Sequence, residues 1–85
     1  MDGFDQNMSR KVMETVTLNS QKGEQYRLAF RGEPDRVYQG IPVVPASDPT
    51  GAERTFSLKV LAPAEQEGRI IRCSADDVIL LEKVE

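Results

Sequence analysis

The spacing of apolar side chains changes from a helical to a strand-like period near the N-terminal end of the chain. Phe4, Met8 and Val12 recur at every fourth position, which predicts one apolar stripe along a short helix. We expect this helix to span residues 4–13. From Glu14 onward apolar and polar residues alternate, which is typical of strands that bury one face.

The alternating segments predict five to six strands in meander order. The strands are expected at residues 14–18, 26–31, 37–44, 56–60, 69–74 and 78–84. Glycine, proline, asparagine and aspartate gather between them, as they do in turns. Small sheets of this kind close into barrels, which removes their unpaired edges. The pattern therefore predicts an all-β fold: one domain, residues 1–85, with a small, strongly bent barrel over 14–84 behind the N-terminal helix.

The composition narrows the class of protein. The chain has 85 residues, 39% of them hydrophobic and 29% charged, which is an ordinary globular balance. Its formal net charge of −3 counts against indiscriminate nucleic-acid binding, although a local basic pocket is compatible with it. No apolar stretch reaches the about 20 residues that a membrane span needs, and no signal-peptide core is present. We expect a cytoplasmic protein with no membrane partner.

The chain lacks the residues on which most catalytic sites depend. It has no histidine and a single cysteine, Cys73, so the common catalytic triads, ordinary zinc sites and an internal disulfide are all excluded. Acidic pairs such as Asp76 and Asp77 fall in predicted turns, where aspartate is favoured for backbone reasons. Cys73 falls within a strand pattern and is expected to be a small buried side chain. We therefore expect a binding protein, not an enzyme, with no metal or cofactor.

Two segments resemble the motifs of the Sm-like family, which includes Sm, LSm and Hfq proteins. The first is Val16–Tyr26, with a glycine turn at Gly23, followed by Asp35–Gln39. The second is Gly68–Cys73, followed by the apolar run Val78–Leu81. The resemblance implies a small SH3-like barrel of the Sm type, and a different SH3-like barrel is the alternative fold.

The resemblance also implies an assembly and a ligand. Sm-like proteins form rings, here expected to hold about five to seven identical subunits, in which the last strand of one subunit pairs with a neighbour. They bind single-stranded RNA near the pore. Carried over to this chain, Tyr38 would stack on a base, Gln39 would read a base edge, and Arg72 would cover the other face or meet phosphate. Asp35 would support the pocket.

The chain departs from the family pattern in ways that favour a second hypothesis. Gln39 replaces the usual Asn, and Cys73 and Leu28 replace usual glycines. The stretch 45–63 is long enough to hold an extra strand or an extended hairpin. Each site residue also has an interpretation without RNA. Tyr38 would then be a packing residue, Gln39 an ordinary surface residue, and Arg72 one partner of a cross-strand ion pair. The alternative function is a self-assembling structural or protein-interaction barrel that binds no nucleic acid.

Overall fold

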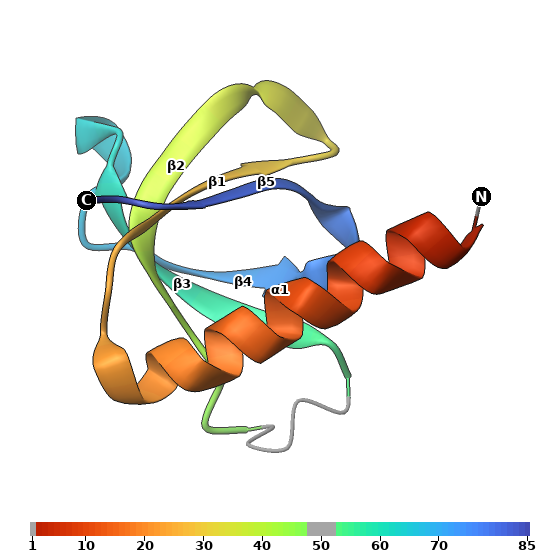
Figure 1. Cartoon of the computed structure of the whole chain (residues 1–85). Helices are drawn as coiled ribbons and strands as arrows, with labels where there is room; N and C mark the ends of the chain where they lie inside the picture. Colours follow the sequence, from red (N-terminus) through yellow and green to blue (C-terminus); the bar gives the residue numbers. More distant parts are fainter. Residues whose placement is uncertain (1, 48–52) are drawn as a thin grey trace.

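The computed structural model describes residues 2–47 and 53–85, with side chains from Met8 onward. Within these ranges the chain forms one long helix followed by an antiparallel sheet (Figure 1). The elements are α1 (Asp2–Lys22), β1 (Tyr26–Phe30), β2 (Glu33–Val43), β3 (Thr55–Ala62), β4 (Ile70–Ser74) and β5 (Val78–Lys83), with single 3₁₀ turns η1 (Ala64–Gln66) and η2 (Ala75–Asp77).

The five strands form one sheet in the order β4-β3-β2-β1-β5, and every neighbouring pair is antiparallel. β4 and β5 are consecutive in the chain and joined only by η2, yet they lie at opposite ends of this order. In the described part of the chain, each of them has a partner strand on one side only. The expected small antiparallel sheet behind an N-terminal helix is confirmed, and its closure into a barrel stays a prediction. The expected meander order is wrong for the last strand, because β5 pairs with β1 and forms no hairpin with β4.

The boundary of the helix was predicted wrongly. α1 continues to Lys22, through the residues 14–18 that were expected to form the first strand. Val12, Val16 and Asn19 follow one another at helical spacing, and all three are fully buried on the face toward the sheet. Leu18, which a strand would have buried with Val16, is 64% exposed instead. The alternation of apolar residues with threonine in this segment fits both periods.

The helix ends at Gly23, where the backbone adopts a φ of +69° that favours glycine. The Gly23 N–H donates to the Asn19 carbonyl at 2.8 Å. The predicted glycine turn is therefore present, but it terminates a helix and does not join two strands. The first segment of the Sm resemblance, Val16–Tyr26, accordingly lies in α1 and its connection to β1.

Pro42 lies in a part of β2 that pairs with β3 but not with β1. β1 pairs with β2 only as far as Gly40, whereas β3 pairs with β2 through Val43. Pro42 thus has a strand on one side only, as its missing N–H predicts. Its carbonyl instead accepts a hydrogen bond from the Asn19 side chain at 2.9 Å. This contact joins the end of α1 to the end of β2.

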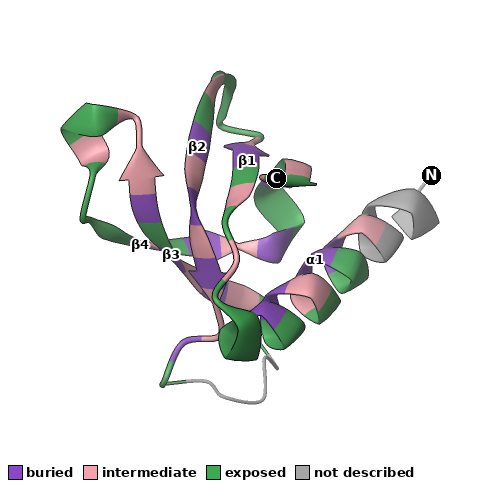
Figure 2. Cartoon of the chain, turned by 60° about the vertical axis from the view of Figure 1, so that its left-hand side comes forward, coloured by how far each residue is buried: buried purple, intermediate pink, exposed green. Residues whose placement is uncertain are grey.

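The hydrophobic core lies between α1 and the inner face of the sheet. Figure 2 shows buried positions along β2 and on the part of α1 that faces the sheet. Phe56, Leu58 and Val60 alternate along β3 and are all fully buried. The other members of the core are Val12, Val16, Leu28, Tyr38, Cys73, Ala75 and Val78. The inner face is therefore apolar along the buried residues of its strands, and a pocket lined by these strands opens at its margin.

No helix in the described ranges has both the length and the apolar character needed to cross a membrane.

Candidate functional site

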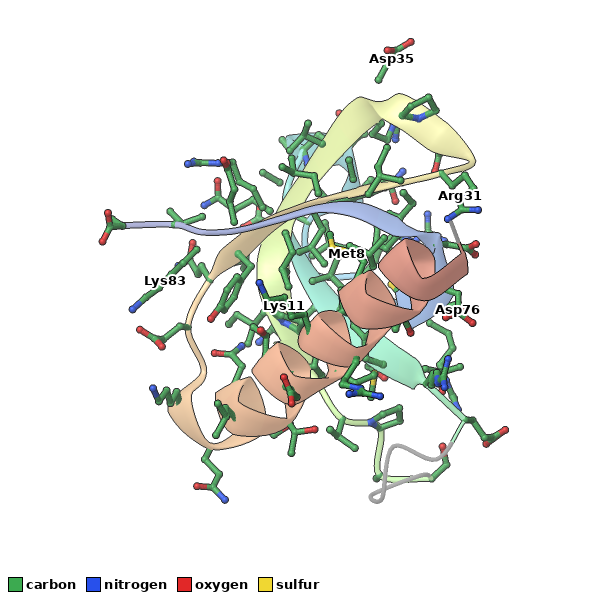
Figure 3. The ribbon with its side chains drawn as sticks, turned by 45° about the vertical axis from the view of Figure 1, so that its right-hand side comes forward. Met8, Lys11, Arg31, Asp35, Asp76 and Lys83 are labelled. Atoms are coloured by element: carbon green, nitrogen blue, oxygen red, sulfur yellow. The ribbon has the colours of Figure 1, made fainter. Side chains whose placement is uncertain are left out.

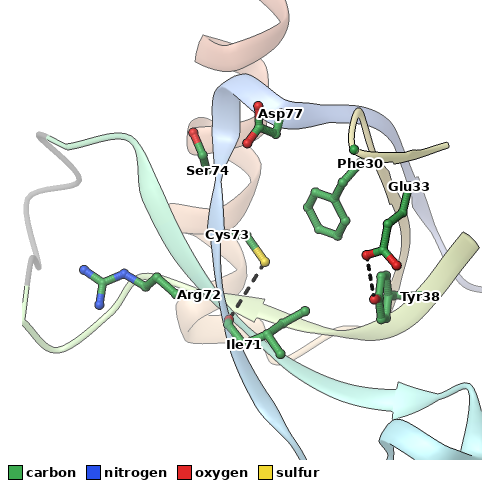
Figure 4. A pocket seen from close by; sticks show the side chains of 9 residues that line it. Phe30, Glu33, Tyr38, Ile71, Arg72, Cys73, Ser74 and Asp77 are labelled. Atoms are coloured by element: carbon green, nitrogen blue, oxygen red, sulfur yellow. Dashed lines mark hydrogen bonds between the residues drawn. The ribbon is translucent and has the colours of Figure 1, made fainter.

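A pocket of about 240 Å³ opens between β4 and the turn that joins β1 to β2 (Figure 4). Nine of the described residues, from β1, the β1–β2 turn, β2, β4 and η2, line it: Phe30, Gly32, Glu33, Tyr38, Ile71, Arg72, Cys73, Ser74 and Asp77. These parts meet because η2 returns the chain from β4 to β5, and the Arg31 N–H donates to the Asp77 carbonyl at 2.7 Å.

The inner wall of the pocket is apolar. Ile71 and Cys73 lie opposite Leu58 and Phe56 in the ladder between β3 and β4, so their side chains face the core side of the sheet. The rings of Phe30 and Tyr38 form the facing wall, with their centroids 5.8 Å apart and their planes inclined by 59°. This tilted geometry is one of the arrangements that aromatic pairs prefer.

Carboxylates stand at the rim of the same pocket. The Tyr38 hydroxyl donates to Glu33 Oε1 at 3.1 Å, and Arg36 Nε lies 3.7 Å from Glu33 Oε2. Arg36 also places its guanidinium carbon 6.0 Å from the centroid of the Tyr38 ring. Asp77 contributes a second carboxylate from η2. The pocket thus combines an aromatic and aliphatic interior with acidic groups near solvent.

The structure places Tyr38 in the core, where the packing interpretation expected it. Its side chain is 7% exposed, and its hydroxyl is already engaged by Glu33. One part of the ring nevertheless lines the pocket, next to Phe30. A flat ligand would reach Tyr38 only through that opening.

Arg72 lies at the same pocket but directs its guanidinium elsewhere. In the ladder with β3 it is opposite Ser57, on the outer face, and its Nε donates to Thr55 Oγ1 at 3.4 Å. Figure 4 shows its side chain extending away from the other labelled side chains. The charge of Arg72 therefore lies outside the pocket interior.

Gln39 and Asp35 are separated from the other two predicted site residues. Gln39 follows Tyr38 in β2, so its side chain leaves the opposite face of the sheet, where Nε2 donates to Gln25 Oε1 at 2.9 Å. Asp35 is exposed near the start of β2 and projects away from the body of the molecule (Figure 3). The structure thus brings Tyr38 and Arg72 to one pocket and leaves Gln39 and Asp35 apart.

Sequence reasoning did not assign Phe30, Glu33, Ile71 and Asp77 to a site. Glu33 and Asp77 fell in the turns between the expected strands, whereas Phe30 and Ile71 fell within the strands expected at 26–31 and 69–74. The available signal was the β1–β2 hairpin itself, because a turn at Gly32 places Phe30 opposite Glu33.

Cys73 is a buried thiol at the back of this pocket. Burial raises its pKa from the ordinary value of 9.0 to about 12, so the reactive thiolate is scarce. We expect iodoacetamide to alkylate Cys73 in the folded protein at least about tenfold more slowly than in urea, even near the ordinary thiol pKa of 9.0. Mass spectrometry over time measures both rates. Equal rates in the two conditions would show that the thiol is accessible.

The raised pKa of Cys73 also predicts how the stability of the fold changes with pH. The folded state keeps the proton while the unfolded state loses it, so the free energy of unfolding falls as the pH rises from about 9 towards 12.

The described residues contain no group of three or more histidine, cysteine, aspartate or glutamate side chains that could hold a metal ion.

The two strands at the ends of the sheet expose apolar side chains. Ile70 begins β4 and is 72% exposed, and Ile79 lies in β5 and is 45% exposed. Strands with an unpaired edge and apolar residues tend to associate with other strands. These two edges, which we call the β4 edge and the β5 edge, form a second candidate surface besides the pocket.

Comparison of this chain with protein-family models, with curated proteins and with solved structures finds no match.

Proposed function

We propose that this chain is a self-assembling small-barrel module, in which the β4 edge of one copy pairs with the β5 edge of the next. The observation that carries the proposal is the sheet order β4-β3-β2-β1-β5, which leaves a one-sided strand at each end of the described sheet. An exposed isoleucine on each of these strands adds apolar surface to the backbone hydrogen bonds that a new strand pair would form.

The two edges differ, so the contact between copies is head-to-tail. Such contacts produce a closed ring when the rotation between copies allows it, and an open filament when it does not. The strong bend of a small SH3-like barrel turns each copy relative to the last and favours closure. The Sm resemblance suggests about five to seven copies in the ring.

The mass in solution tests this assembly. We expect light scattering on a sizing column to give one discrete multi-subunit mass for the wild type, and a monomer for Ile70→Lys, because a charge at the edge opposes strand pairing. Leu18→Lys is the matched control, since Leu18 is 64% exposed but lies on α1, and it should keep the assembly. A monomeric wild type at all concentrations would contradict the proposal.

Mixing two variants tests the head-to-tail geometry. Ile70→Lys keeps an intact β5 edge, and Ile79→Lys keeps an intact β4 edge. Each variant alone should be monomeric, whereas an equimolar mixture should form a dimer with one copy of each and nothing larger. A contact between identical edges would instead leave one of the two variants assembled by itself.

Binding of single-stranded RNA is the second candidate function. The observation in its favour is that Tyr38 and Arg72, two residues that the Sm resemblance implies, line the same pocket. The acidic rim formed by Glu33 and Asp77 opposes phosphate groups, and this places RNA binding second.

The same column run with a short oligouridine tests the RNA candidate. Co-elution with the wild type and an about 5- to 160-fold weaker affinity of Arg72→Ala would support it, since a stacked base is worth about 1–3 kcal/mol. Arg69→Ala is the control, because Arg69 is an exposed arginine that does not line the pocket. An assembly that ignores the oligonucleotide would remove the RNA function and leave the self-assembly intact.

A further inference from the structure

We infer that the pocket between β4 and the β1–β2 turn receives an arginine side chain presented by a partner peptide. This inference does not depend on self-assembly, and it concerns the interior of the pocket, which Arg72 does not reach. Three features of the described residues support it: the walls, the charges at the rim, and the guanidinium of Arg36, which already contacts Glu33 and Tyr38.

The walls fit the flat, weakly hydrated guanidinium group. Phe30 and Tyr38 present ring surfaces 5.8 Å apart between centroids, and Ile71 and Cys73 supply aliphatic and thiol surface opposite them. Guanidinium groups stack on aromatic faces, and the methylene stem of arginine packs on apolar surface. The pocket of about 240 Å³ is therefore suited to a long side chain with a planar charged end.

The charges at the rim favour a cation. Two carboxylates, Glu33 and Asp77, line the pocket, and the single cation in its lining is Arg72. The guanidinium of Arg72 is bonded to Thr55 on the outer side of the sheet and points away from the interior. Arg36 compensates part of the charge of Glu33, since its Nε lies 3.7 Å from Glu33 Oε2. The carboxylate of Asp77 is the second acidic group in the lining, and together they suit a guanidinium better than a phosphate or carboxylate ligand.

The wall formed by Glu33 and Tyr38 already attracts one guanidinium of the protein itself. Arg36 Nε lies 3.7 Å from Glu33 Oε2, and the Arg36 guanidinium carbon lies 6.0 Å from the Tyr38 ring centroid. Glu33 and Tyr38 thus already give Arg36 a carboxylate contact and a ring contact. We expect the arginine of the partner peptide to make contacts of the same two kinds inside the pocket. Arginine is favoured over lysine because its planar group can stack and pair at the same time.

Titration with a blocked amino acid followed by two-dimensional amide NMR tests the inference. N-acetyl-arginine methylamide should give saturable shifts at Gly32, Ile71 and Ser74, with a millimolar dissociation constant. The citrulline analogue has the same shape without the charge and should bind about tenfold more weakly or not at all. Equal binding of the two, or no saturable shift for the arginine compound, would overturn the inference.

Two pocket variants and one distant variant locate the site. Asp77→Asn should weaken binding by about three- to five-fold, as expected for one exposed carboxylate near a cation. Glu33→Gln should weaken binding by a similar factor. It provides an independent test in case Asp77→Asn disturbs η2. Glu65→Gln removes an exposed carboxylate on η1 that does not line the pocket and should have no effect. A loss of affinity with Glu65→Gln equal to that of the pocket variants would indicate nonspecific attraction and overturn the assignment.

The design separates this inference from self-assembly. The β4 edge borders the pocket, so pairing of copies could cover the opening. The titration is therefore repeated on the Ile70→Lys variant, whose β4 edge is open. Arginine binding by this variant alone would keep the site and show that assembly closes it, whereas binding by neither protein would overturn the site. Uridine monophosphate, tested in parallel, would overturn it by binding at the same amides in preference to the arginine compound.

Discussion

Replacing Gly40 with alanine should destabilise the protein by about 3 kcal/mol or more, the upper part of the range for overpacked sites. A Cβ at this position would lie 2.2 Å from the Lys59 carbonyl oxygen and 3.0 Å from Leu58 Cδ1. The first of these neighbours is backbone in β3, so it cannot turn aside as a side chain would. The pairing of β2 with β3 would have to open next to the register shift at Gln39 and Gly40.

Urea unfolding followed by circular dichroism measures this loss. Gly32→Ala is the matched control, because a Cβ there meets nothing within 4 Å and the glycine does not adopt a positive φ. We expect the control to change stability by no more than about 0.5 kcal/mol. A Gly40→Ala protein as stable as this control would show that β2 and β3 lie further apart than described.

Replacing Asn19 with alanine should lower the free energy of unfolding by about 2–4 kcal/mol. The Asn19 amide nitrogen donates to the carbonyls of Glu24 and Pro42, both at 2.9 Å, and its oxygen accepts from the Glu24 N–H at 2.8 Å. Asn19 itself is 1% exposed, so alanine would leave a buried carbonyl and an N–H without their partners. Unsatisfied groups of this kind account for most of the expected cost.

The same unfolding experiment tests Asn19, with Asn19→Asp as a second variant. Aspartate keeps an acceptor for the Glu24 N–H but cannot donate to the two carbonyls when ionised. We expect it to be no more stable than Asn19→Ala. Gln21→Ala, on the exposed side of α1, is the control and should stay within about 0.5 kcal/mol of the wild type. Rescue by aspartate would mean that the accepted bond, and not the donated ones, is what matters.

The strands after Gly23 were largely predictable from the sequence, whereas the extent of the helix was not. Alternation along Thr55–Ala62 matches the structure because this strand buries Phe56, Leu58 and Val60 on one face. In the segment around Val16 the apolar spacing fits both a helix and a strand. In the structure the segment is helical and buries Val16 and Asn19 against the sheet, and the Asn19 side chain donates a hydrogen bond to Pro42, 23 residues away. Local patterns contain no information on a contact of that range.

The candidate site was predictable only in part, because neighbouring side chains in a strand point to opposite faces of the sheet. Tyr38 and Gln39 are neighbours in one strand, so their side chains leave opposite faces and cannot line the same pocket. The resemblance implied a shared site for them, although the strand expected at 37–44 already places neighbouring side chains on opposite faces, as they lie in β2. Glu33 and Asp77 come from segments 44 positions apart in sequence (77 − 33), and only the fold brings them to one rim.

The contact between Asn19 and Pro42 has a consequence for how the chain can vary in length. Only three residues, 23–25, connect α1 to β1. Asn19, in the last turns of α1, and Glu24, in this connection, hold each other through two hydrogen bonds, while the Asn19 side chain also donates to Pro42 at the end of β2. One residue added to or removed from this connection would break the reciprocal bonds or turn the asparagine away from the sheet. We therefore regard the connection between α1 and β1 as fixed in length, so that related chains should differ there by substitution and not by insertion.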